Sequence, residues 1–82
     1  MNLIYNSPNY CVVEFAASGI AQAGGFEIMH KHAKREIFLG GSLAEGFRRG
    51  VAELIASEPT IEQVDEFLSR FDALMQQPMT SH

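Results

Sequence analysis

Residues 24–41 read GGFEIMHKHAKREIFLGG, and this stretch decides the fold. Two runs rich in Ile and Phe lie between two Gly-Gly pairs, and a short polar segment separates them. Alternating apolar residues in short runs predict β-strands, and the polar segment between them predicts a hairpin turn. A loop centred on His32 and Ala33 gives an antiparallel pair in which His30 faces Arg35.

Strand alternation assigns the side chains of this hairpin to two faces. The first face is wholly apolar and holds Phe26, Ile28, Ile37 and Leu39. The second face is half apolar and holds Glu27, Met29, Glu36 and Phe38. The glycine pairs at both ends suit a backbone corner with positive φ or a close approach between two chain segments.

An earlier hairpin is predicted from residues 3–6 (LIYN) and 10–16 (YCVVEFA), because aromatic and β-branched residues favour strands and the Asn-Ser-Pro-Asn segment between them favours a turn. With Tyr5 opposite Tyr10, one face holds Ile4, Cys11, Val13 and Phe15. The other face then holds Leu3, Tyr5, Tyr10, Val12 and Glu14. Residues 16–23 are expected to connect the two hairpins, with room for a short helical turn.

Two helices are predicted over residues 42–77. Ser42 with Glu45, and Thr60 with Gln63, have the spacing of capping boxes. The apolar stripe expected on the first helix is Leu43, Phe47, Val51, Leu54 and Ile55. The second helix is expected to continue to Pro78, with Ile61, Val64, Phe67, Leu68, Phe71, Leu74 and Met75 on its apolar side. Residues 78–82 are expected to form a frayed tail.

Glycine and acidic residues on these helices allow more than one interpretation. Gly46 and Gly50 lower helix propensity, and each is either a place of close backbone approach or a tolerated exposed glycine. The acidic side chains are expected to form a solvated helix surface; they are Glu58, Glu62, Asp65, Glu66 and Asp72. Together these patterns predict an α+β fold: a four-stranded antiparallel sheet of two hairpins followed by two antiparallel helices, in the order ββββαα.

Length and charge narrow the class of protein. A chain of 82 residues is expected to form a single domain, 1–82. One cysteine, Cys11, rules out an internal disulfide, and the start of the chain lacks a signal-peptide pattern, so a cytoplasmic location is expected. No apolar run approaches the roughly 20 residues that a membrane span needs.

Three stretches are similar to a known family. They are GGFEI (24–28), REIFLGG (35–41) followed by AEGF (44–47), and FDALMQQP (71–78). These stretches resemble a family of small uncharacterised proteins from betaproteobacteria, whose function is unknown. The resemblance covers nearly the whole chain and implies a complete, free-standing bacterial protein. It implies no activity, because no catalytic or binding residue is assigned in the family.

The sequence predicts no catalytic residue, metal-ligand set or cofactor site, and therefore no enzyme. His30 and His32 form a His-x-His pair, but His32 falls in the expected turn, and no third ligand lies nearby in the sequence. Cys11 is expected to be a small core residue. A net charge of −4 argues against nucleic acid as a partner. The residues available to contact an anion are Lys31, Lys34, Arg35, Arg48 and Arg49.

The main functional signal is an excess of apolar surface. Two helices can cover one face of a four-stranded sheet, and apolar residues on the other face would then be exposed. The predicted interface residues are Leu3, Tyr5, Tyr10, Val12, Met29 and Phe38. The leading hypothesis is a protein–protein interaction module that forms a homodimer or higher oligomer through this face. Two alternatives remain: an accessory protein that binds nucleic acid through the basic residues, and a small-ligand or metal-binding domain that uses the His pair.

Overall fold

The computed structural model describes residues 2–16, 24–75 and 77–78. Four strands come first: β1 (Asn2–Asn6), β2 (Tyr10–Phe15), β3 (Gly25–His30) and β4 (Arg35–Gly40). They are followed by α1 (Gly41–Ala56), α2 (Ile61–Ser69), the 3-10 helix η1 (Asp72–Leu74) and β5 (Gln77–Pro78). The predicted α+β class, with a four-stranded antiparallel sheet before two helices, is confirmed.

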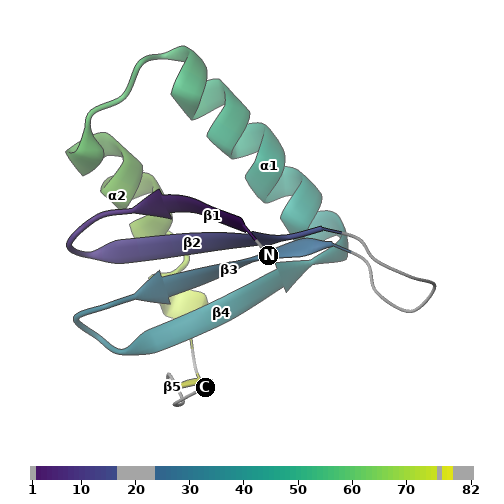
Figure 1. Cartoon of the computed structure of the whole chain (residues 1–82), viewed down its shortest axis with the longest axis vertical. Helices are drawn as coiled ribbons and strands as arrows, with labels where there is room; N and C mark the ends of the chain where they lie inside the picture. The colour runs from purple at the N-terminus through teal and green to yellow at the C-terminus, as the bar shows by residue number, and fades with distance from the viewer. Residues whose placement is uncertain (1, 17–23, 76, 79–82) are drawn as a thin grey trace.

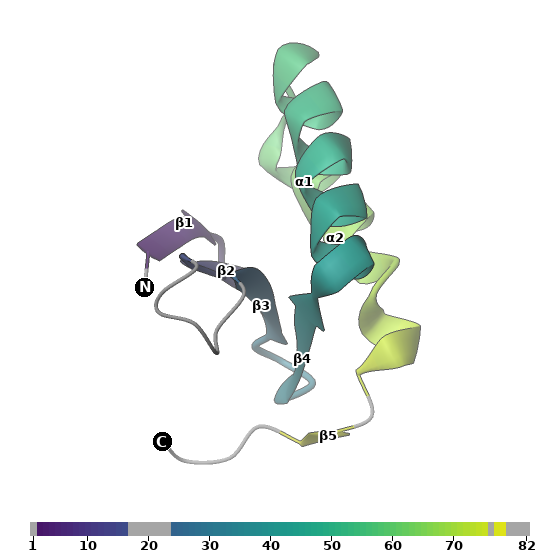
Figure 2. The same ribbon diagram turned by 90° about the vertical axis from the view of Figure 1, so that its right-hand side faces the viewer.

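All strands belong to one antiparallel sheet with the order β1-β2-β3-β4-β5 (Figure 1). Both α-helices lie on the same side of this sheet (Figure 2). The short strand β5 was not predicted; it pairs with β4 through Arg35–Pro78 and Glu36–Gln77. Most of the predicted connection, residues 17–23, and residues 79–82 of the predicted tail lie outside the described residues.

The β3–β4 hairpin agrees with the prediction from its alternation. Phe26 pairs with Leu39 and Ile28 with Ile37, so these four apolar side chains share a face, and His30 pairs with Arg35. A four-residue turn, residues 31–34, connects the strands.

Glycines at the far end of this hairpin serve both of the roles expected of them. Gly25 pairs with Gly40, and the Phe38 ring lies over both. A Cβ atom on Gly25 would lie 2.5 Å from Phe38 Cζ and 2.5 Å from the Leu39 carbonyl oxygen, so the close approach requires glycine. Gly41 has a φ of +58° and forms the corner at which β4 passes into α1.

The β1–β2 hairpin contains an irregularity that the sequence did not reveal. Tyr5 pairs with Val12 and Leu3 pairs with Val13, so the register shifts between Leu3 and Tyr5 and leaves Ile4 as a bulge. The predicted pairing of Tyr5 with Tyr10 is therefore wrong. Because the bulge adds one residue, Leu3 faces the opposite side of the sheet from Tyr5.

Three of the six predicted interface residues lie on the other face of the sheet, so this part of the prediction is wrong. Val12 pairs with Ile28, which places Tyr5, Tyr10 and Val12 on the side that the helices cover. Tyr10 and Val12 are only 4% and 2% exposed and belong to the core, and Tyr5 packs against it. Alternation sorts residues within β2 correctly. It does not reveal which β2 face continues into which β3 face, because that depends on the register between the two strands.

The helix boundaries differ from the prediction at two places. Helix α1 begins at Gly41 with Gly40 as its N-cap and has no side-chain cap, so the predicted Ser42–Glu45 capping box is absent. Strand β4 runs directly into α1, which places Ser42 inside the first turn. The second predicted box is confirmed: Thr60 accepts from Gln63 N, and Gln63 accepts from Thr60 N.

Helix α2 ends at Ser69, well before the predicted end at Pro78. The chain then tightens into η1 and returns to the sheet, where the Met75 carbonyl oxygen accepts a hydrogen bond of 3.2 Å from Arg35 Nη1. This return brings Met75 into the core, with 3% of its surface exposed.

The core fills the space between the sheet and the helices. Phe47 of α1 lies at its centre, with ring centroids 4.9 Å from Phe26, 5.8 Å from Phe67 and 5.4 Å from Phe71. The helical apolar stripes are narrower than predicted, because some of their members are exposed rather than packed. These exposed residues are Leu43, Ile55, Ile61 and Leu74.

Candidate functional site

The side of the sheet opposite the helices carries several apolar side chains, and we call it the open face. No helix of the described residues lies on this side (Figure 2). The strand registers place two glutamates there, Glu27 and Glu36, together with six residues that have apolar or sulfur-containing side chains: Leu3, Cys11, Val13, Phe15, Met29 and Phe38. Three of the predicted interface residues, Leu3, Met29 and Phe38, thus lie on this face. The others are replaced there by residues from β2.

The open face combines exposed and mutually packed side chains. Leu3 is 58% exposed and Phe38 54% exposed, whereas Val13 and Met29 are half-buried. The Phe15 and Phe38 ring centroids are 6.0 Å apart. Cys11, expected in the core, is instead half-buried on this face. The apolar side chains therefore form two groups on this face, with Glu27 between Val13 and Phe38 and Glu36 opposite Met29.

On the other side of the sheet, two aspartates each accept a hydrogen bond from a tyrosine and contact at least one other side chain, and the sequence analysis did not predict either group. Asp65 of α2 accepts hydrogen bonds from Tyr5 Oη at 2.8 Å, Ser7 Oγ at 2.9 Å and Asn9 Nδ2 at 2.9 Å. Ser7 Oγ in turn accepts from the Tyr10 backbone N–H at 3.0 Å. Asp65 therefore attaches α2 to the β1–β2 turn and is not part of a solvated helix surface.

Asp72 makes the corresponding attachment for η1. Both of its carboxylate oxygens lie 3.0 Å from Tyr10 Oη, and Oδ1 lies 3.4 Å from His30 Nδ1. The Tyr10 and His30 rings stack with their centroids 4.5 Å apart. A buried tyrosine needs a hydrogen-bond partner for its hydroxyl group, but this signal becomes usable only once the strand register shows that Tyr5 and Tyr10 face the helices.

These contacts shift the pKa values of the groups involved. Partial burial raises the pKa of Asp65, but hydrogen bonds from Asn9, Tyr5 and Ser7 outweigh this effect and hold the pKa below its ordinary value. Burial, followed by the hydrogen bond to Asp72, raises the pKa of Tyr10 strongly. Burial and the hydrogen bond to Asp65 raise the pKa of Tyr5. At neutral pH these pKa shifts keep Tyr5 and Tyr10 neutral, and they keep Asp65 charged as the acceptor for Tyr5.

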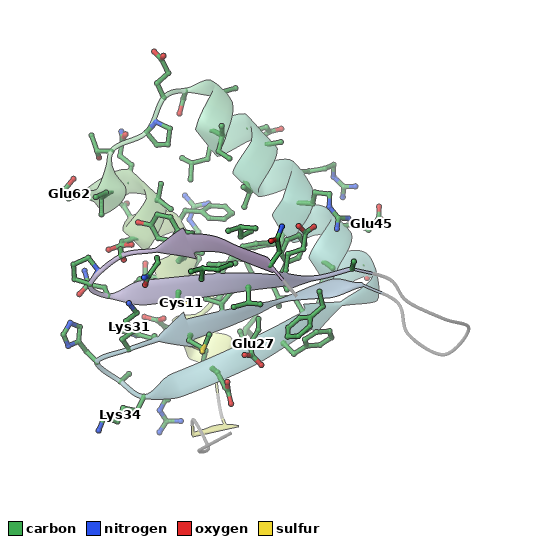
Figure 3. All side chains as sticks on the ribbon, viewed as in Figure 1. Cys11, Glu27, Lys31, Lys34, Glu45 and Glu62 are labelled. Carbon is green, nitrogen blue, oxygen red and sulfur yellow. The ribbon has the colours of Figure 1, made fainter. Side chains whose placement is uncertain are left out.

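The residues predicted to contact an anion do not form one patch. Lys31 and Lys34 lie at the end of the sheet that carries the β3–β4 turn, and Glu45 of α1 lies at the opposite end (Figure 3). Arg48 and Arg49 follow Glu45 by about one helical turn on α1, so they lie far from the two lysines. Lys31 Nζ donates to Asn6 Oδ1 and, at 2.7 Å, to the Ser7 carbonyl oxygen. Arg48 Nη2 lies 3.4 Å from Glu14 Oε2.

A metal site is not assembled in the described part of the chain. There, no three His, Cys, Asp or Glu side chains are placed to hold one ion. His30 contacts Asp72 and Tyr10, and His32 is exposed in the β3–β4 turn. Among the described helices, none is long and apolar enough to span a membrane.

An apolar hollow lies between the sheet and the two α-helices. Its inner pocket has a volume of about 140 Å³ and is lined by Ile4 and Val12 from the sheet, Val51 and Ile55 from α1, and Val64 and Leu68 from α2, among others. An outer groove of about 250 Å³ adjoins it and shares Ile4, Val51 and Ile55. Phe26, Ala52, Glu14 and Arg48 complete this outer groove. We call the two together the α1 groove.

Comparisons with known proteins agree over the whole length of the chain. A family model described as "Protein of unknown function (DUF3567)" matches residues 1–82. A curated protein from Burkholderia thailandensis is 53% identical over 85 residues, and the match covers 100% of both chains. No solved structure matches this chain.

Proposed function

We propose that this chain, which belongs to the DUF3567 family of proteins of unknown function, is a cytoplasmic module that self-associates through its open face. The observation that supports the proposal is the set of six apolar or sulfur-containing side chains on the side of the sheet opposite the helices, of which Leu3 and Phe38 are more than half exposed. Contact between two such faces removes apolar surface from water, which gains about 25 cal/mol per Å². Packing of one sheet on another is a common way to bury apolar side chains on a sheet face that no helix covers.

The size of the open face sets the expected strength of association. Strands β1–β4 are about 4.8 Å apart and contain about six residues each at roughly 3.4 Å per residue. The footprint is therefore about 20 by 20 Å, or roughly 800 Å² for two chains together. Stable interfaces bury about 1,200–2,000 Å². We therefore expect a weak, reversible dimer rather than an obligate one.

In this proposal the chain has no catalytic role. The Asp72–His30 pair is the arrangement closest to catalytic machinery in the described residues, but Tyr10 Oη donates to the Asp72 carboxylate and the Tyr10 ring covers one side of His30. The pair instead fastens η1 to the sheet. The proposed function of the chain is therefore binding through its open face.

Sedimentation velocity from about 10 μM to about 1 mM tests the proposal, because weak interfaces dissociate within this range. We expect the average mass to rise from 9.1 kDa towards twice that value. Leu3→Glu should weaken association by about tenfold or more, because it places a charge in the contact. Leu43→Glu is the matched control: Leu43 is 59% exposed, against 58% for Leu3, but lies on α1. A monomer throughout the range, or equal effects of the two substitutions, would refute the proposal.

A further inference from the structure

The α1 groove is a second apolar surface, separate from the open face. It lies on the side of the sheet that the helices cover, so its residues take no part in the proposed dimer contact. Sheet, α1 and α2 each contribute walls to the inner pocket, and those walls come from strands and helices rather than loops. The pocket therefore exists before any ligand arrives.

The inner pocket is suited to hydrocarbon alone. Aliphatic side chains such as Val12, Val51 and Val64 line it. The one hydroxyl group in its lining, Tyr5 Oη, donates to Asp65 at 2.8 Å and is already satisfied. A polar group placed in this pocket would lose its bonds to water without gaining new ones. A volume of about 140 Å³ can hold the end of an alkyl chain.

A cation stands at the other end of the groove. Arg48 lines the outer groove one to two helical turns before Val51 and Ile55, and its guanidinium carbon lies 5.1 Å from the centroid of the Phe26 ring. The distance from Arg48 to Ile55 along α1 is about 10 Å. The groove thus offers a hydrocarbon path of moderate length that ends at Arg48 and its ion-pair partner Glu14.

Arg48 retains donors for a ligand. Within the described residues its only hydrogen bond is the 3.4 Å contact with Glu14, and its side chain is 54% exposed. A guanidinium group has five N–H donors, and exposed ion pairs are weak, so a ligand can share or displace Glu14. One guanidinium group can bind a carboxylate through two hydrogen bonds and balance its single charge, whereas the double charge of a phosphate monoester would be balanced only in part.

We propose that the α1 groove binds a medium-chain fatty acid, with the alkyl chain in the inner pocket and the carboxylate at Arg48. Non-specific attraction of such an anion is unfavourable, because the net charge of the chain is −4. Binding would therefore depend on the local match of one cation with one apolar groove. This inference goes beyond the proposed self-association and does not require it.

NMR titration of the labelled protein with octanoate tests the proposal. We expect saturable shifts of the Val12, Val51 and Val64 methyl signals. Arg48→Gln should weaken octanoate binding by about tenfold. The same substitution should leave the weaker binding of octan-1-ol unchanged. Arg49→Gln is the matched control: Arg49 neighbours Arg48 in the sequence, is 74% exposed, and does not line the groove.

A second test fills the groove with a larger side chain at an exposed position, so that the core is not disturbed. Ala52 lines the outer groove, whereas Ala56 does not; both are exposed on α1. Ala52→Phe should abolish octanoate binding, and Ala56→Phe should not. Leu3→Glu, which tests the dimer, should leave octanoate binding intact. The proposal would be overturned by the absence of saturable shifts at millimolar octanoate, by shifts confined to the open face, by equal losses in Arg48→Gln and Arg49→Gln, or by tighter binding of octyl phosphate.

Discussion

Two glycines on α1 provide a matched test of helix packing. Gly46 and Gly50 lie one turn apart, and each lowers helix propensity by about 1 kcal/mol relative to alanine. A Cβ atom at Gly46 would have nothing within 4 Å. One at Gly50 would lie 2.9 Å from Phe67 Cζ and 3.1 Å from Phe67 Cε1. The two interpretations of these glycines therefore apply to different positions: Gly46 is tolerated, and Gly50 allows α2 to approach.

Alanine at the two positions should have opposite effects on the free energy of unfolding. Gly46→Ala should raise it by about 1 kcal/mol, and the melting temperature by about 4–8 °C. Gly50→Ala gains the same propensity but must displace the Phe67 ring, and overpacking costs about 1–3 kcal/mol. Displacing the ring disturbs its contacts with Phe47 and Phe71, whose centroids lie 5.8 Å and 5.9 Å away, although the ring also borders the inner pocket and can shift towards it. The net change should lie between about zero and a loss of 2 kcal/mol.

Urea unfolding followed by far-ultraviolet circular dichroism measures both changes, because the chain has no tryptophan. Phe67→Leu should restore the benefit of Gly50→Ala by removing the ring atoms that the new methyl group meets. Equal stabilisation by Gly46→Ala and Gly50→Ala would refute the packing argument. So would a Gly50→Ala penalty that persists unchanged in the Phe67→Leu background.

Three further predictions concern the contacts that shape the fold. Asp65 has a lowered pKa in the folded state, so the stability it provides is present above its ordinary pKa of 3.8 and is lost as pH falls through the folded value. Asp65→Asn should therefore lower stability at pH 7 and flatten its decline below about pH 4 in acid titrations followed by circular dichroism. Tyr10→Phe should cost about 1–2 kcal/mol in urea unfolding, because Asp72 loses a hydrogen bond; an unchanged midpoint would contradict that role. Gly40→Ala should be rescued by Phe38→Ala, since its Cβ atom would meet only the Phe38 ring, whereas Gly25→Ala should not be rescued, since it also meets the Leu39 carbonyl oxygen. Thermal melts of the single and double variants measure this difference.

Local pattern was enough to predict strands β1–β4, the two α-helices and their order along the chain. The period-two alternation of β3 and β4 places Phe26 with Leu39 and His30 with Arg35, and Thr60 and Gln63 cap α2 as their spacing indicates. These features depend on residues close together in the chain, where backbone geometry leaves few alternatives.

The surfaces were harder to predict, because they depend on contacts between distant residues. The bulge at Ile4 moves Leu3 across the sheet, and the β2–β3 register decides that Val12 rather than Val13 joins Ile28. Tyr10 and Val12 are aromatic and β-branched residues, as are Phe15 and Val13 on the open face. Only the whole sheet shows that they lie on its covered side.

The α1 groove follows from how α1 is set on the sheet. The corner at Gly41 directs α1 away from the end of β4, and Figure 1 shows the α1–α2 connection beyond the β1 edge. Near its start α1 is close to the sheet and buries Ala44 and Phe47, but Ile55 at its far end is 63% exposed. A helix that packed evenly along its length would have closed this space with its own aliphatic side chains. Its divergence leaves them as the walls of a groove, and the same sequence pattern that predicts a core stripe therefore also supplies the lining of the proposed binding site.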